Sequence, residues 1–85
     1  MAFSFTVDRP NDWERVFEKM KAELEKHGGT LHGDKNQGEI SSSGVAGTYE
    51  VGASSVKITV TKKPFIAPEK MVENEIRKIF GEVSS

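Results

Sequence analysis

The stretch GVAGTYEVGASSVKITVTK, residues 44–62, contains two runs in which apolar and polar residues alternate. The apolar members are Val45, Tyr49, Val51, Val56, Ile58 and Val60. A period of two is typical of a strand with one buried face. The small residues at 52–55 are typical of a turn. The stretch therefore predicts two neighbouring strands with the side chains of Lys57, Thr59 and Thr61 facing solvent.

Upstream of this stretch, the sequence predicts a strand followed by a helix. Phe3, Phe5 and Val7 alternate with polar residues, and Pro10 ends the strand because it lacks an N–H donor. Asn11 and Glu14 have the spacing of a capping box, which predicts that a helix begins at Asn11. The apolar stripe of this helix comprises Trp13, Val16, Phe17, Met20, Leu24 and His27, and Gly28-Gly29 ends it.

Two polar strands and a final helix complete the expected order. The polar strands span about 30–35 and 39–43, with a turn at 36–38 and with Leu31 and Ile40 as their main apolar residues. Pro68 is expected at the first helical position, and Ile66 and Met71 have the spacing of a hydrophobic staple. The stripe of the last helix comprises Val72, Ile76, Ile79, Phe80 and Val83.

This pattern predicts a two-layer α+β domain over residues 1–85, in the order β-α-β-β-β-β-α. Four consecutive strands favour an antiparallel meander, and both apolar helix stripes need cover, so we expect both helices on one face of the sheet. The layout is similar to a truncated helix-grip fold. Exposed edges of such a short sheet favour weak homodimers.

Composition excludes several classes of function. The chain has 85 residues, and 12 Lys+Arg against 13 Asp+Glu give a net charge of −1 without a basic block, so we expect no nucleic-acid partner. It has no cysteine, which excludes disulfides and thiolate sites. No apolar run approaches the roughly 20 residues of a membrane span, and no signal peptide is visible. We expect a cytoplasmic protein without a cofactor.

Catalytic and clamp-like motifs have structural interpretations as well. The tetrapeptide at 44–47 has the GxxG form of a KH-domain clamp, but it lies between expected strands, where a turn at Gly44 and a bend or bulge at Gly47 explain it. His32 and Asp34 have the spacing of a general-base pair, although an ordinary exposed pair is the commoner arrangement. His27 and His32, without a carboxylate cluster, do not make a metal site.

The loop KKPFIAP, residues 62–68, contains the candidate contact residues Phe65 and Ile66. They either close the edge of the core, cap a cavity or contact a partner. Lys62 and Lys63 either keep the strand end soluble or touch an anionic group. The candidate ligand or partner contacts are Gly47, Tyr49, Phe65 and Ile66.

Residues 38–80 resemble the small proteins of the polyhydroxyalkanoic acid system family, which are associated with storage granules. The matching residues are Gly44, Val45, Gly47, Val51, Val56, Ile58, Val60, Pro68, Ile76 and Ile79. Asp8–Pro10 is also similar to the start of the family, whereas the loop 62–68 departs from it. The resemblance implies association with polyester granules or their operons in bacteria, and it implies no catalytic mechanism.

Three functions remain open from the sequence. The first is a non-enzymatic accessory protein that binds a hydrophobic granule surface or a protein partner through Phe65, Ile66 and the last helix. The second is a carrier of a small apolar ligand in a pocket between helices and sheet. The third is an enzyme that uses His32 and Asp34, for which no further catalytic group is visible.

Overall fold

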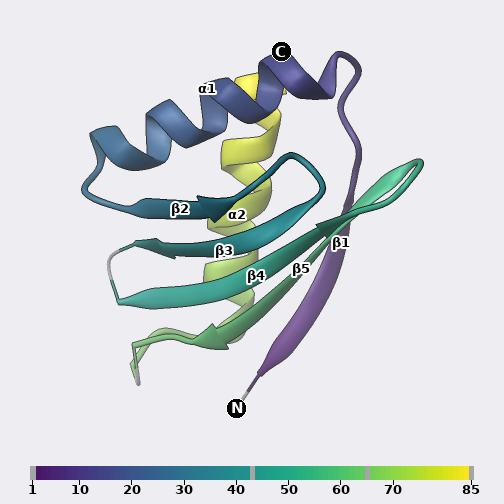
Figure 1. The fold of residues 1–85 in the computed structure, drawn as a ribbon. Coiled ribbons are helices and arrows are strands. Elements are labelled where there is room, and N and C mark those ends of the chain that lie inside the picture. Colours follow the sequence, from purple (N-terminus) through teal and green to yellow (C-terminus); the bar gives the residue numbers. More distant parts are fainter. Residues whose placement is uncertain (1, 43, 65, 85) are drawn as a thin grey trace.

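The computed structural model describes residues 2–42, 44–64 and 66–84, with seven elements in the predicted order (Figure 1). The strands are β1 (Phe3–Asp8), β2 (Thr30–Gly33), β3 (Gln37–Ser42), β4 (Val45–Val51) and β5 (Ser55–Lys62). The helices are α1 (Trp13–Lys26) and α2 (Glu69–Ser84). The predicted α+β class and element order are confirmed.

The strands form one antiparallel sheet in the order β1-β5-β4-β3-β2. The strands β2 to β5 form the predicted meander, and β1 joins its far side by pairing with β5. Phe5 lies opposite Ile58 and Val7 lies opposite Val56 in this pair. The register therefore places the apolar residues of both strands on the same face.

Both helices pack on that apolar face. In Figure 1, α2 runs behind the sheet, and α1 crosses its C-terminal end beside β2. Trp13 of α1 stacks on Phe80 of α2 with ring centroids 6.3 Å apart, and Phe17 contacts Tyr49 of β4 at 6.2 Å. The buried core comprises Phe5, Val7, Trp13, Val16, Phe17, Tyr49, Val56, Ile58, Val60, Val72 and Phe80. The core thus joins the two helix stripes to the inner face of the sheet.

The start of α1 differs from the predicted capping box. The cap is Asp12, in a left-handed conformation with φ 57°, and its side chain makes no capping hydrogen bond. Its carboxylate instead accepts a hydrogen bond from Arg15 Nε at 2.9 Å, and Glu14 forms an ion pair with Lys35. The prediction at Asn11 was wrong because the acidic residues of this turn have basic partners that compete with the backbone.

The hydrophobic staple predicted at the start of α2 is also absent. Ile66 is 90% exposed and Met71 is 58% exposed, so neither side chain packs against the core. The carbonyl of Pro68 accepts hydrogen bonds from Met71 N–H and Val72 N–H, which makes Pro68 the residue before the first helical position. Of the rest of the predicted stripe, Val72 and Phe80 are buried, Ile76 is half-buried and Ile79 is 37% exposed, and the side chain of Val83 lies outside the described part of the chain.

The glycines of the GVAG segment have the structural roles expected of them. Gly44 lies between β3 and β4 with φ +82°, a conformation that suits glycine. The register shifts between Ala46 and Gly47, which is a β-bulge. A Cβ atom at Gly47 would meet the carbonyl oxygen of Thr59 and lie 3.1 Å from Val60 Cα. A segment between two strands is not the helix-flanked loop of a KH clamp.

Candidate functional site

The structure separates the candidate contact residues predicted from the sequence. Gly47 and Tyr49 are buried in β4, and Tyr49 is only 6% exposed. Ile66 projects from the loop before α2 with 90% of its surface exposed. Phe65 lies outside the described residues. The three described candidates, Gly47, Tyr49 and Ile66, therefore do not form one site, because Ile66 lies on a different surface from the two interior residues.

The interior between helices and sheet holds one small apolar cavity beside Tyr49. Its volume is about 30 Å³, whereas pockets for small molecules usually measure about 300–1,000 Å³. The lining residues are Trp13, Phe17, Met20, Leu31, Ile40, Tyr49, Val56, Ile58 and Phe80. The cavity is lined by apolar atoms, and its volume is close to that of a single water molecule.

The loop before α2 holds Ile66 away from the core through its own hydrogen bonds. Ala67 N–H donates to the Pro64 carbonyl at 3.1 Å, which closes a turn around Ile66. The ammonium group of Lys63 donates to the Ala67 carbonyl at 2.7 Å. These two hydrogen bonds join the residues on either side of Ile66, whose side chain is 90% exposed.

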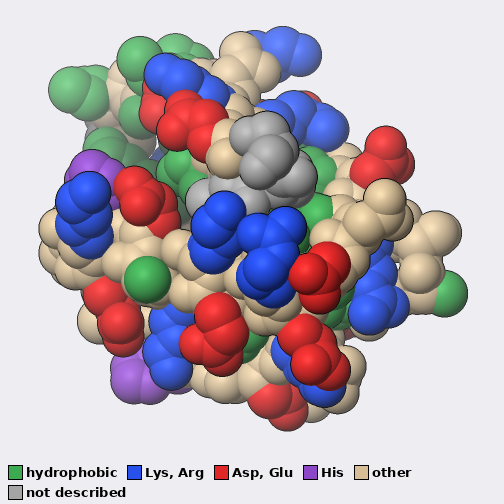
Figure 2. Space-filling model, turned by 90° about the horizontal axis from the view of Figure 1, so that it is seen from above, with side chains coloured by type: hydrophobic (Ala, Val, Ile, Leu, Met, Phe, Trp, Pro, Cys, Tyr) green, Lys and Arg blue, Asp and Glu red, His purple; other side chains and the backbone are tan. Residues whose placement is uncertain are grey.

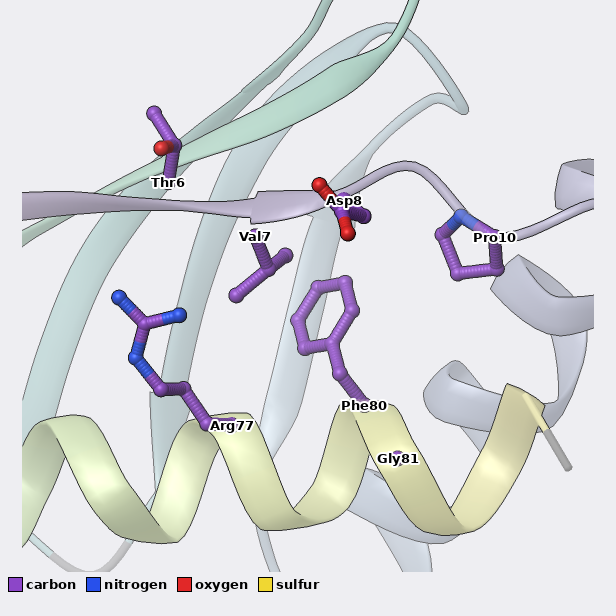
Figure 3. Close-up of a pocket in the computed structure, with 7 residues that line it drawn as sticks. All are labelled: Thr6, Val7, Asp8, Pro10, Arg77, Phe80 and Gly81. Atoms are coloured by element: carbon purple, nitrogen blue, oxygen red, sulfur yellow. The ribbon is translucent and has the colours of Figure 1, made fainter.

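A second hollow lies between β1 and α2, and Figure 3 shows its walls. It is an open surface groove of about 360 Å³, lined by Thr6, Val7, Asp8, Pro10, Arg77, Phe80 and Gly81. Val7 and Phe80 face each other across it, and Arg77 reaches from α2 towards β1. Arg77 also lies 5.1 Å from the ring centroid of Phe5 and donates from Nε to Glu73 at 2.8 Å.

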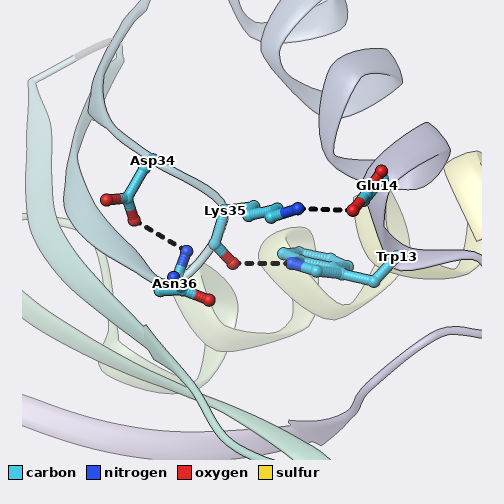
Figure 4. A network of polar contacts seen from close by, with 5 residues as sticks. All are labelled: Trp13, Glu14, Asp34, Lys35 and Asn36. Atoms are coloured by element: carbon cyan, nitrogen blue, oxygen red, sulfur yellow. Dashed lines mark hydrogen bonds and ion pairs between the residues drawn. The ribbon is translucent and has the colours of Figure 1, made fainter.

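The turn between β2 and β3 is fixed to α1 by a network of polar contacts (Figure 4). Trp13 Nε1 donates to the Lys35 carbonyl at 2.8 Å, and Lys35 forms an ion pair with Glu14. The Asp34 carboxylate accepts hydrogen bonds from the backbone N–H groups of Asn36, at 2.8 Å, and Gln37, at 3.0 Å. This arrangement is an Asx turn, so the turn begins two residues earlier than the sequence indicated.

Two pKa values are shifted around this turn. The hydrogen bonds from Asn36 and Gln37 lower the pKa of Asp34 below 3.8. Burial, and secondarily the charge of Asp34, raises the pKa of Tyr49 above 10.0. The Tyr49 hydroxyl donates to the Asp34 main-chain carbonyl at 2.6 Å. The Asp34 carboxylate and the Tyr49 hydroxyl therefore both stabilise the turn through hydrogen bonds.

The pair of His32 and Asp34 does not form a catalytic constellation in the structure. His32 is exposed on β2, and no hydrogen bond or ion pair joins it to Asp34 among the described residues. The other histidine, His27, lies 3.6 Å from Glu23 at the end of α1. In the described part of the chain, no three His, Asp or Glu side chains gather as metal ligands do.

The charged side chains are mixed over the surface. Figure 2 shows Lys and Arg interspersed with Asp and Glu on the face seen from above, with neither sign gathered into one patch. Within residues 2–42, 44–64 and 66–84, neither helix is long and apolar enough to cross a membrane.

Comparison with known proteins gives no match. No family model, no curated protein and no solved structure matches the chain. Functional inference therefore depends on the described residues.

Sequence reasoning missed the groove between β1 and α2 and the polar anchoring of the turn. Arg77, Phe80 and Gly81 are far from Asp8 in the sequence, and no motif links them. The hydrogen bond from Trp13 to Lys35 spans 22 residues. The one available signal was Asp34 itself, because Asp side chains in turns commonly accept hydrogen bonds from the backbone two residues further on.

Proposed function

We propose that the protein is a non-enzymatic binding protein of the bacterial cytoplasm that attaches to the hydrophobic surface of polyhydroxyalkanoate storage granules. The contact surface consists of Ile66 and Met71, in the loop before α2 and in the first turn of α2. The observation that carries the proposal is the 90% exposure of Ile66, an apolar residue next to the hydrogen bonds that Ala67 makes with Pro64 and Lys63.

The exposure of Ile66 has an energetic cost that a hydrophobic partner removes. Full burial of an Ile or Met side chain stabilises by about 1.5–3 kcal/mol. Met71 adds to the surface because 58% of it is exposed. The hydrogen bond from Ala67 N–H to the Pro64 carbonyl is already present without a partner, so attachment does not have to form it. Two such residues support reversible attachment.

The test replaces both apolar residues by serine. The double variant Ile66→Ser, Met71→Ser is expected to lose at least about tenfold in binding to particles of poly-3-hydroxybutyrate, because it removes most of the buried apolar area. Co-sedimentation of the purified protein with the particles gives the bound fraction. Both side chains are exposed, so the free energy of unfolding is expected to change by less than about 0.5 kcal/mol each.

The matched control makes the same kind of substitution elsewhere on α2. Ile79 is 37% exposed and lies near the other end of α2, so Ile79→Ser is expected to retain granule binding. If wild-type protein fails to bind the particles, or if Ile79→Ser weakens binding as strongly as the double variant, the proposed contact surface is wrong.

The second candidate function is a carrier of a small apolar ligand. The lining of the interior cavity favours it, because Tyr49 and its neighbours present only apolar atoms there, but the volume of about 30 Å³ is too small without rearrangement. An NMR titration with a fatty acid separates the two functions. Shifts concentrated at Tyr49 and Ile58 favour the carrier, and an unchanged interior excludes it.

A further inference from the structure

The two edges of the sheet are unequally protected. The edge strand β2 has four residues and packs beside α1. The other edge strand, β1, has six residues, and its only neighbour in the sheet is β5. Long edge strands without proline, lysine or a covering element are the ones that pair with another chain. The outer side of β1 is therefore the open edge of the described sheet.

The main-chain groups along this edge are oriented for further pairing. Arg9 N–H donates to the Ser54 carbonyl at 3.0 Å, which places the odd-numbered residues of β1 in hydrogen-bonded pairs with β5. Since main-chain groups alternate along a strand, the N–H and C=O groups of Ser4, Thr6 and Asp8 point away from β5. These three residues form the row available to a second strand.

The groove beneath β1 keeps this row accessible. Gly81 contributes no side chain, and a Cβ atom at that position would have nothing within 4 Å. Arg77 forms an ion pair with Glu73 and lies over the ring of Phe5, which is on the inner face. Figure 3 shows the side chain of Thr6 pointing away from α2. The helix below the edge therefore leaves room for a neighbouring strand.

We infer that the occupant of this edge is β1 of a second copy of the chain, in an antiparallel pair whose two-fold axis passes beside Thr6. In this register Thr6 faces Thr6 of the second copy, and Ser4 faces Asp8 of the second copy. The three pairs exchange about six main-chain hydrogen bonds. The two five-stranded sheets then form one continuous sheet with the helices of both copies on the same face.

The side chains of β1 complement each other in this register. Phe5 lies beside Val7 of the second copy, and aromatic and β-branched residues form favourable cross-strand pairs. Asp8, the only charged residue of β1, faces Ser4 of the second copy. The two Asp8 side chains of the dimer therefore lie apart. Lys57 lies opposite Thr6 within one sheet. The two Lys57 side chains are then three strand spacings apart, about 14 Å, where salt screens their repulsion.

Self-complementarity is what favours a second copy over an extended segment of another protein. A foreign segment needs side chains that match Ser4, Thr6 and Asp8, whereas the chain itself supplies a matching row at equal concentration. One strand pair buries much less than the roughly 1,200 Å² of a stable interface, so the dimer dissociates readily on dilution.

The experiment uses the pair at the axis. Thr6→Lys places four cations in one row, because Lys57 flanks the substituted residue in each copy. We expect this variant to weaken association at least about tenfold in sedimentation velocity over a concentration series reaching the millimolar range. Thr6→Glu places an anion at the same position. When unlabelled Thr6→Glu is added to ¹⁵N-labelled Thr6→Lys, the β1 amides of the labelled protein are expected to shift.

A matched control places the same charge at the opposite edge. His32 is exposed on β2, so His32→Lys is expected to associate as wild type does. Circular dichroism checks that each variant is folded. The inference is overturned if wild-type protein stays monomeric throughout the series, if Thr6→Lys associates like wild type, or if Thr6→Glu leaves the β1 amides of Thr6→Lys unchanged. It is distinct from granule binding, which the variants at Ile66 and Met71 test.

Discussion

Asp34 stabilises the turn between β2 and β3 in its ionised form. Its pKa is lowered below 3.8 by hydrogen bonds from Asn36 N–H and then Gln37 N–H. A folded-state pKa below the unfolded value means that the stabilisation is complete above about pH 3.8. It is lost as the pH falls from there through the folded-state pKa.

The corresponding prediction concerns Asp34→Asn, which keeps the acceptor oxygen and removes the charge. The variant is expected to be less stable than wild type at neutral pH, and this difference is expected to shrink as the pH falls below about 3.8. Urea denaturation at several pH values measures the difference, and NMR titration of the side-chain carboxyl measures the pKa. A titration midpoint at or above 3.8 contradicts the prediction.

Gly47 is required by the close approach of β5. Gly47→Ala is expected to lower the free energy of unfolding by about 1–3 kcal/mol, because the new methyl group meets the carbonyl of Thr59 and backbone atoms cannot move aside cheaply. Gly52→Ala is the control, since its Cβ would lie 3.4 Å from the Ser55 carbonyl. Chemical denaturation in which the two variants lose equal stability would count against the requirement for glycine where β5 approaches Gly47.

The helix α2 contains a glycine that has no steric reason to be there. Gly81 lies inside the helix, and nothing would contact a Cβ atom at that position within 4 Å. Glycine in a helix interior costs about 0.5–1 kcal/mol relative to alanine. Gly81→Ala is therefore expected to raise the free energy of unfolding by that amount in thermal or urea denaturation.

Gly28 is the matched control for this substitution. A Cβ atom at Gly28 would also have nothing within 4 Å, but the φ of this residue is +85°, which ends α1 in the left-handed conformation. Gly28→Ala is expected to cost about 1–2 kcal/mol, because a Cβ atom disfavours that conformation. If both substitutions change stability in the same direction, backbone conformation is not the deciding factor.

The elements themselves were predictable from the sequence because their apolar periods are regular. Alternation of apolar and polar residues predicted the two strands of the stretch 44–62, and the apolar stripe from Trp13 to Leu24 predicted α1. The capping box and the staple were wrong, because short motifs do not reveal competing partners such as Lys35 for Glu14. The pairing of β1 with β5 was not predicted, because alternation does not say which strand lies alongside.

The candidate contacts were only partly predictable for a similar reason. The exposure of Ile66 depends on the turn that Pro64 and Ala67 close, and its apolar character alone is equally consistent with a core position. Tyr49 was placed correctly on the inner face, but its hydroxyl donates a hydrogen bond to the Asp34 main-chain carbonyl. The groove beside β1 is formed by segments more than 60 residues apart in sequence, from Asp8 to Phe80.

Burial within the whole molecule is greatest along β5. Val56, Ile58 and Val60 are at most 1% exposed, and β5 lies between β1 and β4. Amides in such buried strands open only with the whole fold, whereas edge amides exchange through local opening. Hydrogen exchange of dilute protein is expected to be slowest in β5 and much faster at Thr6 and Asp8. Equal protection across β1 and β5 would contradict this distribution.

The pairing of the first strand with the fifth has a consequence for synthesis of the chain. β1 ends at residue 8 and β5 ends at residue 62, so 54 residues must be added before the pair is complete. At about 5–20 residues per second on the ribosome, this takes about 3–11 seconds. Throughout that interval the nascent β1 has no partner within its own chain. The fold is thus acquired late, because the sheet partner of β1 is the last strand to be made.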